Sequence, residues 1–256
     1  MEVHVYAFVC GRHTIPRVNM IEGSDGDITI PIVGFVVRHR DGLFVFDTGF
    51  SRRVYEDLYE YYPNEALKTR TFHFTAEDEL VAQMRALDFD PDAVRLLSNS
   101  HLHYDHSGGN ATFPDATVIV QRAEWDAATS APSESTGYRP SDFDTGQKQL
   151  LIDGEHDVFG DGSVVLFPTN GHTRGHQSLQ VQCPDGTAVL AGDACYMQET
   201  LDGGRLPGAR NLADPTNYLE SLEKLQSFTA SGSVVFVGHD PDFWATRPLA
   251  PRPLLG

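Results

Sequence analysis

Short runs of apolar residues alternate with polar turns along the whole chain, which predicts many strands joined by tight turns and a few helices. The runs Ile28 to His39 and Leu43 to Phe46 are separated by Arg40-Asp41-Gly42, a sequence typical of a hairpin turn. Helical spacing of apolar residues is found from Leu80 to Leu87 and from Tyr218 to Leu225. Further strands are predicted at Val3 to Val9, Val94 to Leu97, Thr117 to Val120, Gln149 to Ile152, Asp157 to Phe159, Ser163 to Pro168, Leu179 to Gln182, Thr187 to Ala191 and Ser233 to Val237.

Three polar or irregular segments interrupt this pattern. The segment from Gly11 to Asp27 contains Pro and Gly and is predicted to be a loop, and its isolated His13 is interpreted as a surface residue. The tyrosine-rich segment from Ser51 to Phe74 has helical spacing, which favours core packing; an aromatic flap over an active site is the alternative. The segment from Ala128 to Lys148 is rich in Ser, Pro and Gly and is expected to be a long irregular excursion.

Composition and charge exclude several classes of partner. With 256 residues, of which 40% are hydrophobic, the chain can bury a sizeable core as one or two domains. The net charge of −17 argues against nucleic acid and an anionic membrane surface as partners, and no apolar run approaches the roughly 20 residues of a membrane span. An odd number of cysteines and no recognisable export signal indicate reduced thiols and a cytoplasmic location.

Four candidate metal ligands fall within six positions after the predicted strand Val94 to Leu97. They are His101, His103, Asp105 and His106. Alternate residues of an extended segment point the same way, so the first two histidines can face one ion and the last two residues a second ion. Imidazole and carboxylate suit zinc, iron or manganese better than calcium or magnesium. Four ligands cannot close two sites, so the rest of the chain must supply more; a solvated histidine-rich loop is the alternative.

Other candidate residues follow predicted strands elsewhere in the chain. His172 and His176 lie between glycines after one strand, Asp193 follows a strand and a glycine, and His239 follows the last strand. Asp47 begins an Asp-Thr-Gly turn, for which an ordinary turn is an equally good interpretation. For His176, a hydrogen-bonding role that fixes its loop is the preferred interpretation.

The run His101-Leu102-His103-Tyr104-Asp105-His106 resembles the His-x-His-x-Asp-His motif of the metallo-β-lactamase superfamily. The run Gly171-His172-Thr173-Arg174-Gly175-His176 resembles a second loop of that superfamily, and the match extends from Ile28 to His239. The resemblance implies an α/β fold, the four-layer αβ/βα sandwich, formed by residues 1–256 as a single domain. It also implies a first ion held by His101, His103 and His172, a second held by Asp105, His106 and His239, Asp193 bridging them, and Asp47 and His176 supporting the ligands from behind.

Within the superfamily, the chain is most similar to the N-acyl homoserine lactonases. The similarity is carried by the His101 to His106 run with Ser107-Gly108-Gly109-Asn110 behind it, by Val120 to Glu124, by Gly175 to Leu179 and above all by Asp193-Ala194-Cys195-Tyr196. In those lactonases a tyrosine three residues after the bridging aspartate points at the substrate carbonyl, and Tyr196 has that position; a core aromatic is the alternative. The resemblance implies a quorum-quenching hydrolase in which a metal-bridging hydroxide opens the lactone, Tyr196 stabilises the oxyanion and Asp105 carries a proton to the leaving alkoxide.

Several alternatives share this fold. A pyridoxolactonase-like lactonase, a glyoxalase II-like thioester hydrolase and a β-lactamase are other hydrolases, and Tyr196 favours a lactone over a thioester. Diiron redox relatives typically replace the second histidine of the motif with Glu, whereas His103 is retained, and a complete ligand set argues against a binding module with a dead site. The expected cofactors are two divalent ions, zinc first, with iron, manganese or cobalt as alternatives. The expected partner is a small lactone, and a homodimer is left open.

Overall fold

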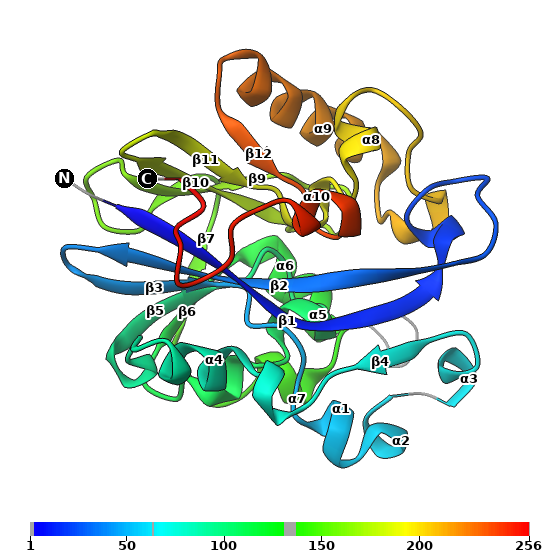
Figure 1. Ribbon diagram of the computed structural model, residues 1–256, viewed down its shortest axis with the longest axis horizontal. Coiled ribbons are helices and arrows are strands. Elements are labelled where there is room, and N and C mark those ends of the chain that lie inside the picture. Colours follow the sequence, from blue (N-terminus) through cyan, green and yellow to red (C-terminus); the bar gives the residue numbers. More distant parts are fainter. Residues whose placement is uncertain (1–2, 63, 131–136, 256) are drawn as a thin grey trace.

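Two mixed β-sheets lie face to face in the computed structural model, which describes residues 3–62, 64–130 and 137–255 (Figure 1). The first sheet has seven strands in the order β4 (Thr71–His73), β1 (His4–Pro16), β2 (Asp27–His39), β3 (Gly42–Phe46), β5 (Val94–Ser98), β6 (Thr117–Gln121) and β7 (Gln149–Ile152). The second has five, in the order β12 (Val234–Phe236), β11 (Gly186–Leu190), β10 (Gln177–Cys183), β9 (Val164–Pro168) and β8 (His156–Asp157).

Helices cover the outer faces of both sheets. Figure 1 shows α8 and the long α9 above the five-stranded sheet, and α4 and α7 below the seven-stranded sheet. This order of helices, sheet, sheet and helices confirms the predicted four-layer sandwich. The helices are α1 (Arg53–Glu56), α2 (Leu58–Tyr61), α3 (Asn64–Leu67), α4 (Leu80–Ala86), α5 (Tyr104–Ser107), α6 (Arg122–Ser130), α7 (Pro140–Phe143), α8 (Gln198–Leu201), α9 (Pro215–Ala230) and α10 (Pro241–Ala245), with 3₁₀ turns η1 (Arg17–Asn19), η2 (Ala76–Asp78), η3 (Pro91–Ala93), η4 (Asn110–Thr112), η5 (Gly192–Ala194) and η6 (Ala209–Asn211).

The space between the sheets is filled by one apolar cluster to which both contribute. Phe35 and Phe46 of the first sheet belong to the same buried cluster as Leu179 and Val189 of the second. Full burial of each such side chain stabilises the fold by roughly 1.5–3 kcal/mol. Because these strands are covered on both faces, they appear in the sequence as continuous apolar runs rather than as alternating ones.

The chain direction brings the candidate residues to one edge of the sandwich. Strands β3, β5, β6 and β7 run parallel to one another, and β11 runs parallel to β12. Asp47 follows β3, the His101 motif follows β5, and His239 follows β12. The carboxyl ends of parallel strands are where α/β folds commonly carry their chemistry.

The prediction of a loop from Gly11 to Asp27 is wrong in its first part. Strand β1 continues to Pro16, pairs with β2 and also pairs with β4. Gly11, at φ 91°, lies at the register shift after Val9, and an added Cβ would lie 2.8 Å from Phe74. Glycine thus permits an irregularity that carries the strand onward. The interpretation of His13 as a surface residue is also wrong, since its side chain is only 1% exposed.

The tyrosine-rich segment forms the short helices α1 and α2, in which Tyr61 is buried and Tyr59 is exposed. Within the predicted excursion from Ala128 to Lys148, α6 continues to Ser130, residues 131–136 lie outside the described residues, and α7 follows.

Among the described residues, no helix combines the length and apolar character that crossing a bilayer requires.

Candidate metal centre

The loop after β5 is held in place by polar contacts with the turn after β3. The backbone N–H of Ser100 donates to Asp47 Oδ1 at 2.7 Å, and the Ser100 hydroxyl donates to Asp47 Oδ2 at 2.9 Å. A Cβ added at Gly108 would lie 2.2 Å from the Ser51 nitrogen, and one added at Gly109 would lie 2.5 Å from the Thr48 carbonyl oxygen of this turn. The two glycines of the motif therefore allow the histidine loop to pack against the preceding segment.

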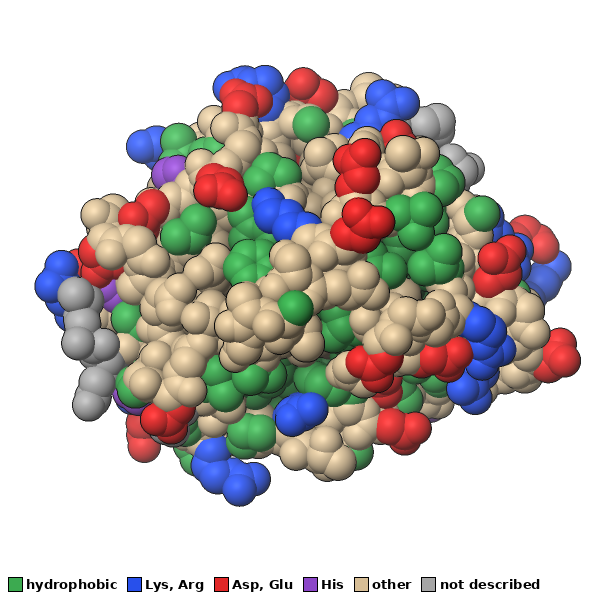
Figure 2. All heavy atoms as spheres, turned by 90° about the horizontal axis from the view of Figure 1, so that it is seen from above, with side chains coloured by type: hydrophobic (Ala, Val, Ile, Leu, Met, Phe, Trp, Pro, Cys, Tyr) green, Lys and Arg blue, Asp and Glu red, His purple; other side chains and the backbone are tan. Residues whose placement is uncertain are grey.

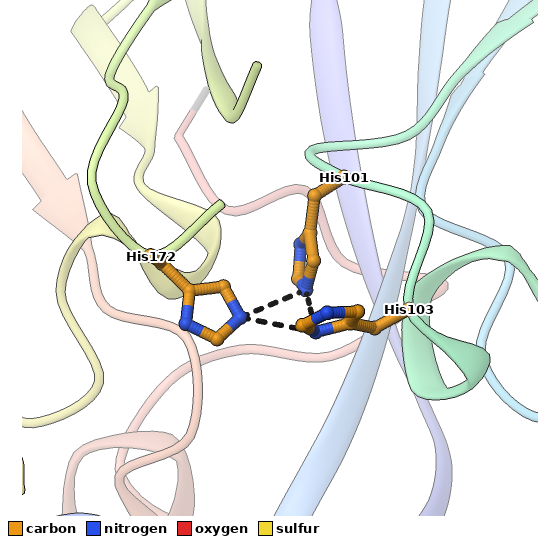
Figure 3. Close-up of side chains that lie close together, drawn as sticks. All are labelled: His101, His103 and His172. Atoms are coloured by element: carbon orange, nitrogen blue, oxygen red, sulfur yellow. Dashed lines mark hydrogen bonds between the residues drawn. The ribbon is translucent and has the colours of Figure 1, made fainter. Parts of the chain in front are cut away.

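Three imidazole nitrogens from two loops converge on one point (Figure 3). His101 Nε2 lies 2.9 Å from His103 Nδ1, and His172 Nε2 lies 3.1 Å from each of these two atoms. Three nitrogens bound to one tetrahedral zinc ion would lie about 3.4 Å apart, close to this arrangement. His172 arrives after β9, so the group joins the two sheets.

A second group consists of Asp105, His106 and His239, whose potential ligand atoms all lie within 4.8 Å of one another. Asp193, in η5 after β11, lies between this group and the first. Its Oδ1 is 3.2 Å from His106 Nε2 and 2.9 Å from His239 Nε2. Its Oδ2 is 3.3 Å from His172 Nε2. One carboxylate therefore presents one oxygen to each group, the arrangement needed to bridge two ions.

Three buried polar atoms at this point contact one another but make no hydrogen bond of good geometry with any described residue. They are His106 Nε2, His239 Nε2 and Asp193 Oδ1, the last of which lies 3.2 Å and 2.9 Å from the two nitrogens as ion-pair contacts. Leaving such an atom unsatisfied costs about 1–3 kcal/mol, so a folded protein needs a reason to keep three together. Their convergence and their chemistry fit a cation.

Burial and the Asp193 charge control the protonation of the cluster. Burial lowers the pKa of His101 and His103 well below the ordinary value, which leaves lone pairs available for a metal. Burial alone would raise the pKa of Asp193, but His106, His239 and other neighbours hold it well below its usual range. In turn, Asp193 raises the pKa of His106 and His239 against the effect of burial.

Asp47 and His176 lie behind the cluster and contact its members. Asp47 Oδ2 is 2.9 Å from His106 Nδ1, which directs the other ring nitrogen toward Asp193. His176 Nε2 accepts a hydrogen bond from the backbone N–H of Asp193 at 2.9 Å, and burial lowers the pKa of His176 to about 3. A neutral imidazole thus holds the Asp193 backbone, and His176 belongs to no potential ligand group of the described residues.

Tyr196 reaches the cluster through His172. The Tyr196 hydroxyl oxygen and the Asn211 carbonyl oxygen each lie 2.8 Å from His172 Nδ1. If Nε2 of this ring faces a metal, Nδ1 carries the proton and donates to these oxygens. The Tyr196 O–H is then free to donate to another acceptor. Burial raises the pKa of this hydroxyl well above the ordinary value.

A cavity of about 670 Å³ opens onto both groups. Asp105, Tyr196 and His239 line it, together with residues that the sequence did not indicate, above all His13 and Arg70. Glu124 was also missed as a functional residue. The sequence shows that Glu124 ends the run Val120 to Glu124. Its buried contacts with the loops of Leu102 and Gly175 form only in the folded chain.

Two facing sheets with a buried His/Asp cluster at one edge define a metal-binding α/β protein. The sequence profile of the metallo-beta-lactamase superfamily matches residues 30–239, and the chain belongs to this superfamily. It is 35% identical over 262 residues to the N-acyl homoserine lactonase AttM of Rhizobium radiobacter, a match that covers 98% of each chain. An N-acyl homoserine lactonase of a Bacillus species is 30% identical and matches 83% of this chain and 82% of its own.

A solved structure is similar over nearly the whole chain. It is that of an N-acyl homoserine lactone hydrolase with the product N-hexanoyl-L-homoserine bound at the catalytic metal centre. The TM-score is 0.87 at 25% identity, over 99% of this chain and 100% of that one. The similarity places the layers and loops described above in the same overall arrangement.

Proposed function

We propose that this protein is a metal-dependent hydrolase that opens the lactone ring of N-acyl homoserine lactones, and so is a quorum-quenching lactonase. The observation that carries the proposal is the position of Asp193 between two groups of ligand atoms, with Tyr196 three residues later in the same cavity. Relatives named as N-acyl homoserine lactonases match 98% of the chain, which supports this substrate class.

The proposed cofactors are two divalent ions, zinc first, with iron, manganese or cobalt as alternatives. We assign the first ion to His101, His103 and His172, the second to Asp105, His106 and His239, and the bridging role to Asp193. Such ions lower the pKa of a water molecule to near neutrality and polarise a carbonyl group.

The chain's own residues supply orientation and proton positions. Burial raises the pKa of Tyr196, and with the proton of His172 on Nδ1 the Tyr196 O–H can donate to the oxygen on which charge develops during attack on the carbonyl. Asp105 lines the cavity and can carry a proton to the leaving alkoxide. Asp47 and His176 hold His106 and the Asp193 backbone, which keeps the ligands in a fixed orientation.

We also propose that residues 1–256 form one domain, since a single apolar cluster receives side chains from both sheets. Three free cysteines favour a reducing compartment and thus a cytoplasmic location. A homodimer stays a prediction, which sedimentation analysis would test.

The proposed function is tested by lactone hydrolysis on protein whose metal content is measured. The substrates are short- and long-chain N-acyl homoserine lactones, a γ-lactone, a pyridoxolactone, a thioester and a β-lactam. Fast opening of the acyl homoserine lactones with about two metals per chain is expected. Two metals without turnover of these substrates would contradict the substrate class.

A matched variant tests the bridging role. Asp193→Ala should lose bound metal and activity together, whereas Asp185→Ala, in an exposed turn, should lose neither. A fully active Asp193→Ala protein would refute the assignment.

A further inference from the structure

The charges that line the cavity differ from those of the chain as a whole. The sequence has 36 acidic and 19 basic residues, and Figure 2 shows acidic and basic side chains interspersed over one face of the molecule. In the described lining of the cavity, the carboxylates are those of Asp105 and Asp193, both proposed as metal ligands. All other formally charged side chains there are arginines: Arg70, Arg139, Arg174 and Arg210. Single-sign walls in a cleft attract ligands of the opposite charge.

Arg70 is the arginine whose position is built into the sheet. It directly precedes β4, which pairs with β1 through His13 opposite Phe72. Because side chains alternate along a strand, Arg70 lies on the same face as Phe72. The Phe72 ring stacks on the His13 ring, with centroids 4.4 Å apart. The edge of the seven-stranded sheet thus presents Arg70 and His13 to the same cavity.

Arg70 is half-buried and forms no ion pair with a described residue, although, against the effect of burial, the Asp105 carboxylate acts on it electrostatically and helps to raise its pKa. One nitrogen, Nη1, donates to the Tyr104 hydroxyl at 3.1 Å. A guanidinium has five N–H donors in a planar fork that matches a carboxylate. The nearby Asp105 is assigned to a metal ion, so the guanidinium has N–H donors that no carboxylate of the described residues pairs with, which favours a ligand that supplies one.

His13 provides a second polar group beside Arg70. Its Nε2 atom is buried and has no hydrogen-bond partner among the described residues. The His13 ring also packs edge-to-face on Tyr104, with centroids 6.1 Å apart. Arg70, Tyr104 and His13 therefore form one polar corner of the cavity, which we call the Arg70 corner.

The Arg70 corner and Tyr196 reach the cavity from different sheets. Tyr196 and His172 come from loops of the five-stranded sheet, whereas Arg70 and His13 come from the edge of the seven-stranded sheet. A lactone held near Tyr196 would extend its acyl group toward the other wall. A lactone held at Tyr196 can therefore meet Arg70 with a part of its acyl group other than the reacting carbonyl.

We propose that Arg70 makes this enzyme selective for lactones whose acyl chain carries an ionised carboxylate, which the guanidinium binds through paired N–H donors. The inference rests on the proposed lactonase function and names its substrate class more narrowly. The neutral counterpart, an acyl chain with a terminal methyl group, cannot accept from the remaining N–H donors of Arg70 and binds less tightly.

The test compares N-adipoyl and N-hexanoyl homoserine lactone, which have the same number of acyl carbons and differ in the terminal carboxylate. With metal-loaded protein, kcat/KM should be at least tenfold higher for the adipoyl substrate, mainly through a lower KM, and added salt should reduce the difference. Arg70→Met should lower the adipoyl-to-hexanoyl ratio at least tenfold, and Arg70→Lys should retain part of it. Arg85→Met removes an exposed arginine outside the cavity and should leave the ratio unchanged.

A binding measurement separates this inference from the proposed function. Calorimetry of the metal-loaded protein should show tighter binding of adipate than of hexanoate, and Arg70→Met should remove the difference. If neither lactone is opened, the proposed function fails while calorimetry still decides the role of Arg70. Three results would overturn the inference. They are an adipoyl-to-hexanoyl ratio of kcat/KM of one or less in the unaltered protein, a preference for a neutral 3-oxo acyl chain instead, and a ratio that Arg70→Met leaves unchanged.

Discussion

Glu124 Oε2 accepts a hydrogen bond from the backbone N–H of Gly175 at 3.1 Å. The other oxygen of this buried carboxylate accepts from the backbone N–H of Leu102 at 2.9 Å and from the Tyr138 hydroxyl at 3.0 Å. One side chain of α6 thus joins the loop that carries His101 to the loop that carries His172 and His176. The contact requires glycine, because a Cβ at position 175 would lie 2.1 Å from the Glu124 nitrogen.

Replacing Glu124 should therefore loosen both loops. Glu124→Ala leaves the N–H groups of Leu102 and Gly175 buried without an acceptor, and we expect the free energy of unfolding to fall by about 3 kcal/mol. Metal affinity should fall with it, since the two loops carry all three members of the first ligand group. Urea unfolding and metal titration measure these effects. Glu220→Ala, on the exposed side of α9, should change stability by less than about 0.5 kcal/mol. Equal stability of the two variants would contradict the role of Glu124.

Replacing Asp47 should weaken metal binding rather than substrate binding. Its carboxylate contacts His106 Nδ1 and both the backbone and hydroxyl of Ser100. Asp47→Asn keeps one acceptor but loses the charge that orients the imidazole, and outer contacts of this kind contribute about 10- to 100-fold to metal affinity. Competition with a chelator measures the affinity. A variant that loses kcat while retaining full affinity for both ions would show that Asp47 acts in another way.

Tyr196→Phe should retain both ions and lose part of the rate. It removes the hydroxyl proposed to donate to the developing oxyanion, and we expect kcat to fall about 10- to 100-fold, below the full loss of a main oxyanion donor. Tyr218→Phe is a matched control, because the Tyr218 hydroxyl is buried without a hydrogen-bond partner among the described residues. Steady-state kinetics with metal analysis distinguish the two variants. If Tyr196→Phe had the unaltered rate, Tyr196 would have no part in the reaction, although the lactonase proposal would stand.

The candidate ligands could be found in the sequence because their spacing is local and each set follows a predicted strand. His101 to His106 lie within six positions, and Asp193 and His239 directly follow strands. The Arg70 corner could not be found in this way. His13 and Phe72 are 59 positions apart, and their contact depends on an irregularity at Gly11 that appears in the sequence as a turn. Likewise, the pattern predicts a helix at Glu124 but not that its carboxylate is buried between two loops.

The buried carboxyl group of Asp142, outside the metal cluster, should make the stability of the protein depend on pH. It lies in α7, is 1% exposed, and accepts a hydrogen bond from Tyr61. Burial raises its pKa from 3.8 to about 7, although the contacts with Tyr61, Ser141 and Arg139 act in the opposite direction. Between these two values the folded protein holds a proton that the unfolded chain has released. The contribution to stability is therefore complete below about pH 4 and is lost as the pH rises through about 7.

Asp142→Asn removes this titration while keeping a carbonyl oxygen to accept from Tyr61. Relative to the unaltered protein, the variant should become more stable between pH 5 and pH 8, by a difference on the order of 2 kcal/mol. Urea unfolding of both proteins at the two pH values gives the difference directly, and effects of the metal ligands cancel in the comparison. Asp144→Asn, an exposed neighbour, should show the same pH dependence as the unaltered protein. A parallel pH dependence of Asp142→Asn would mean that Asp142 is ionised in the folded protein throughout this range.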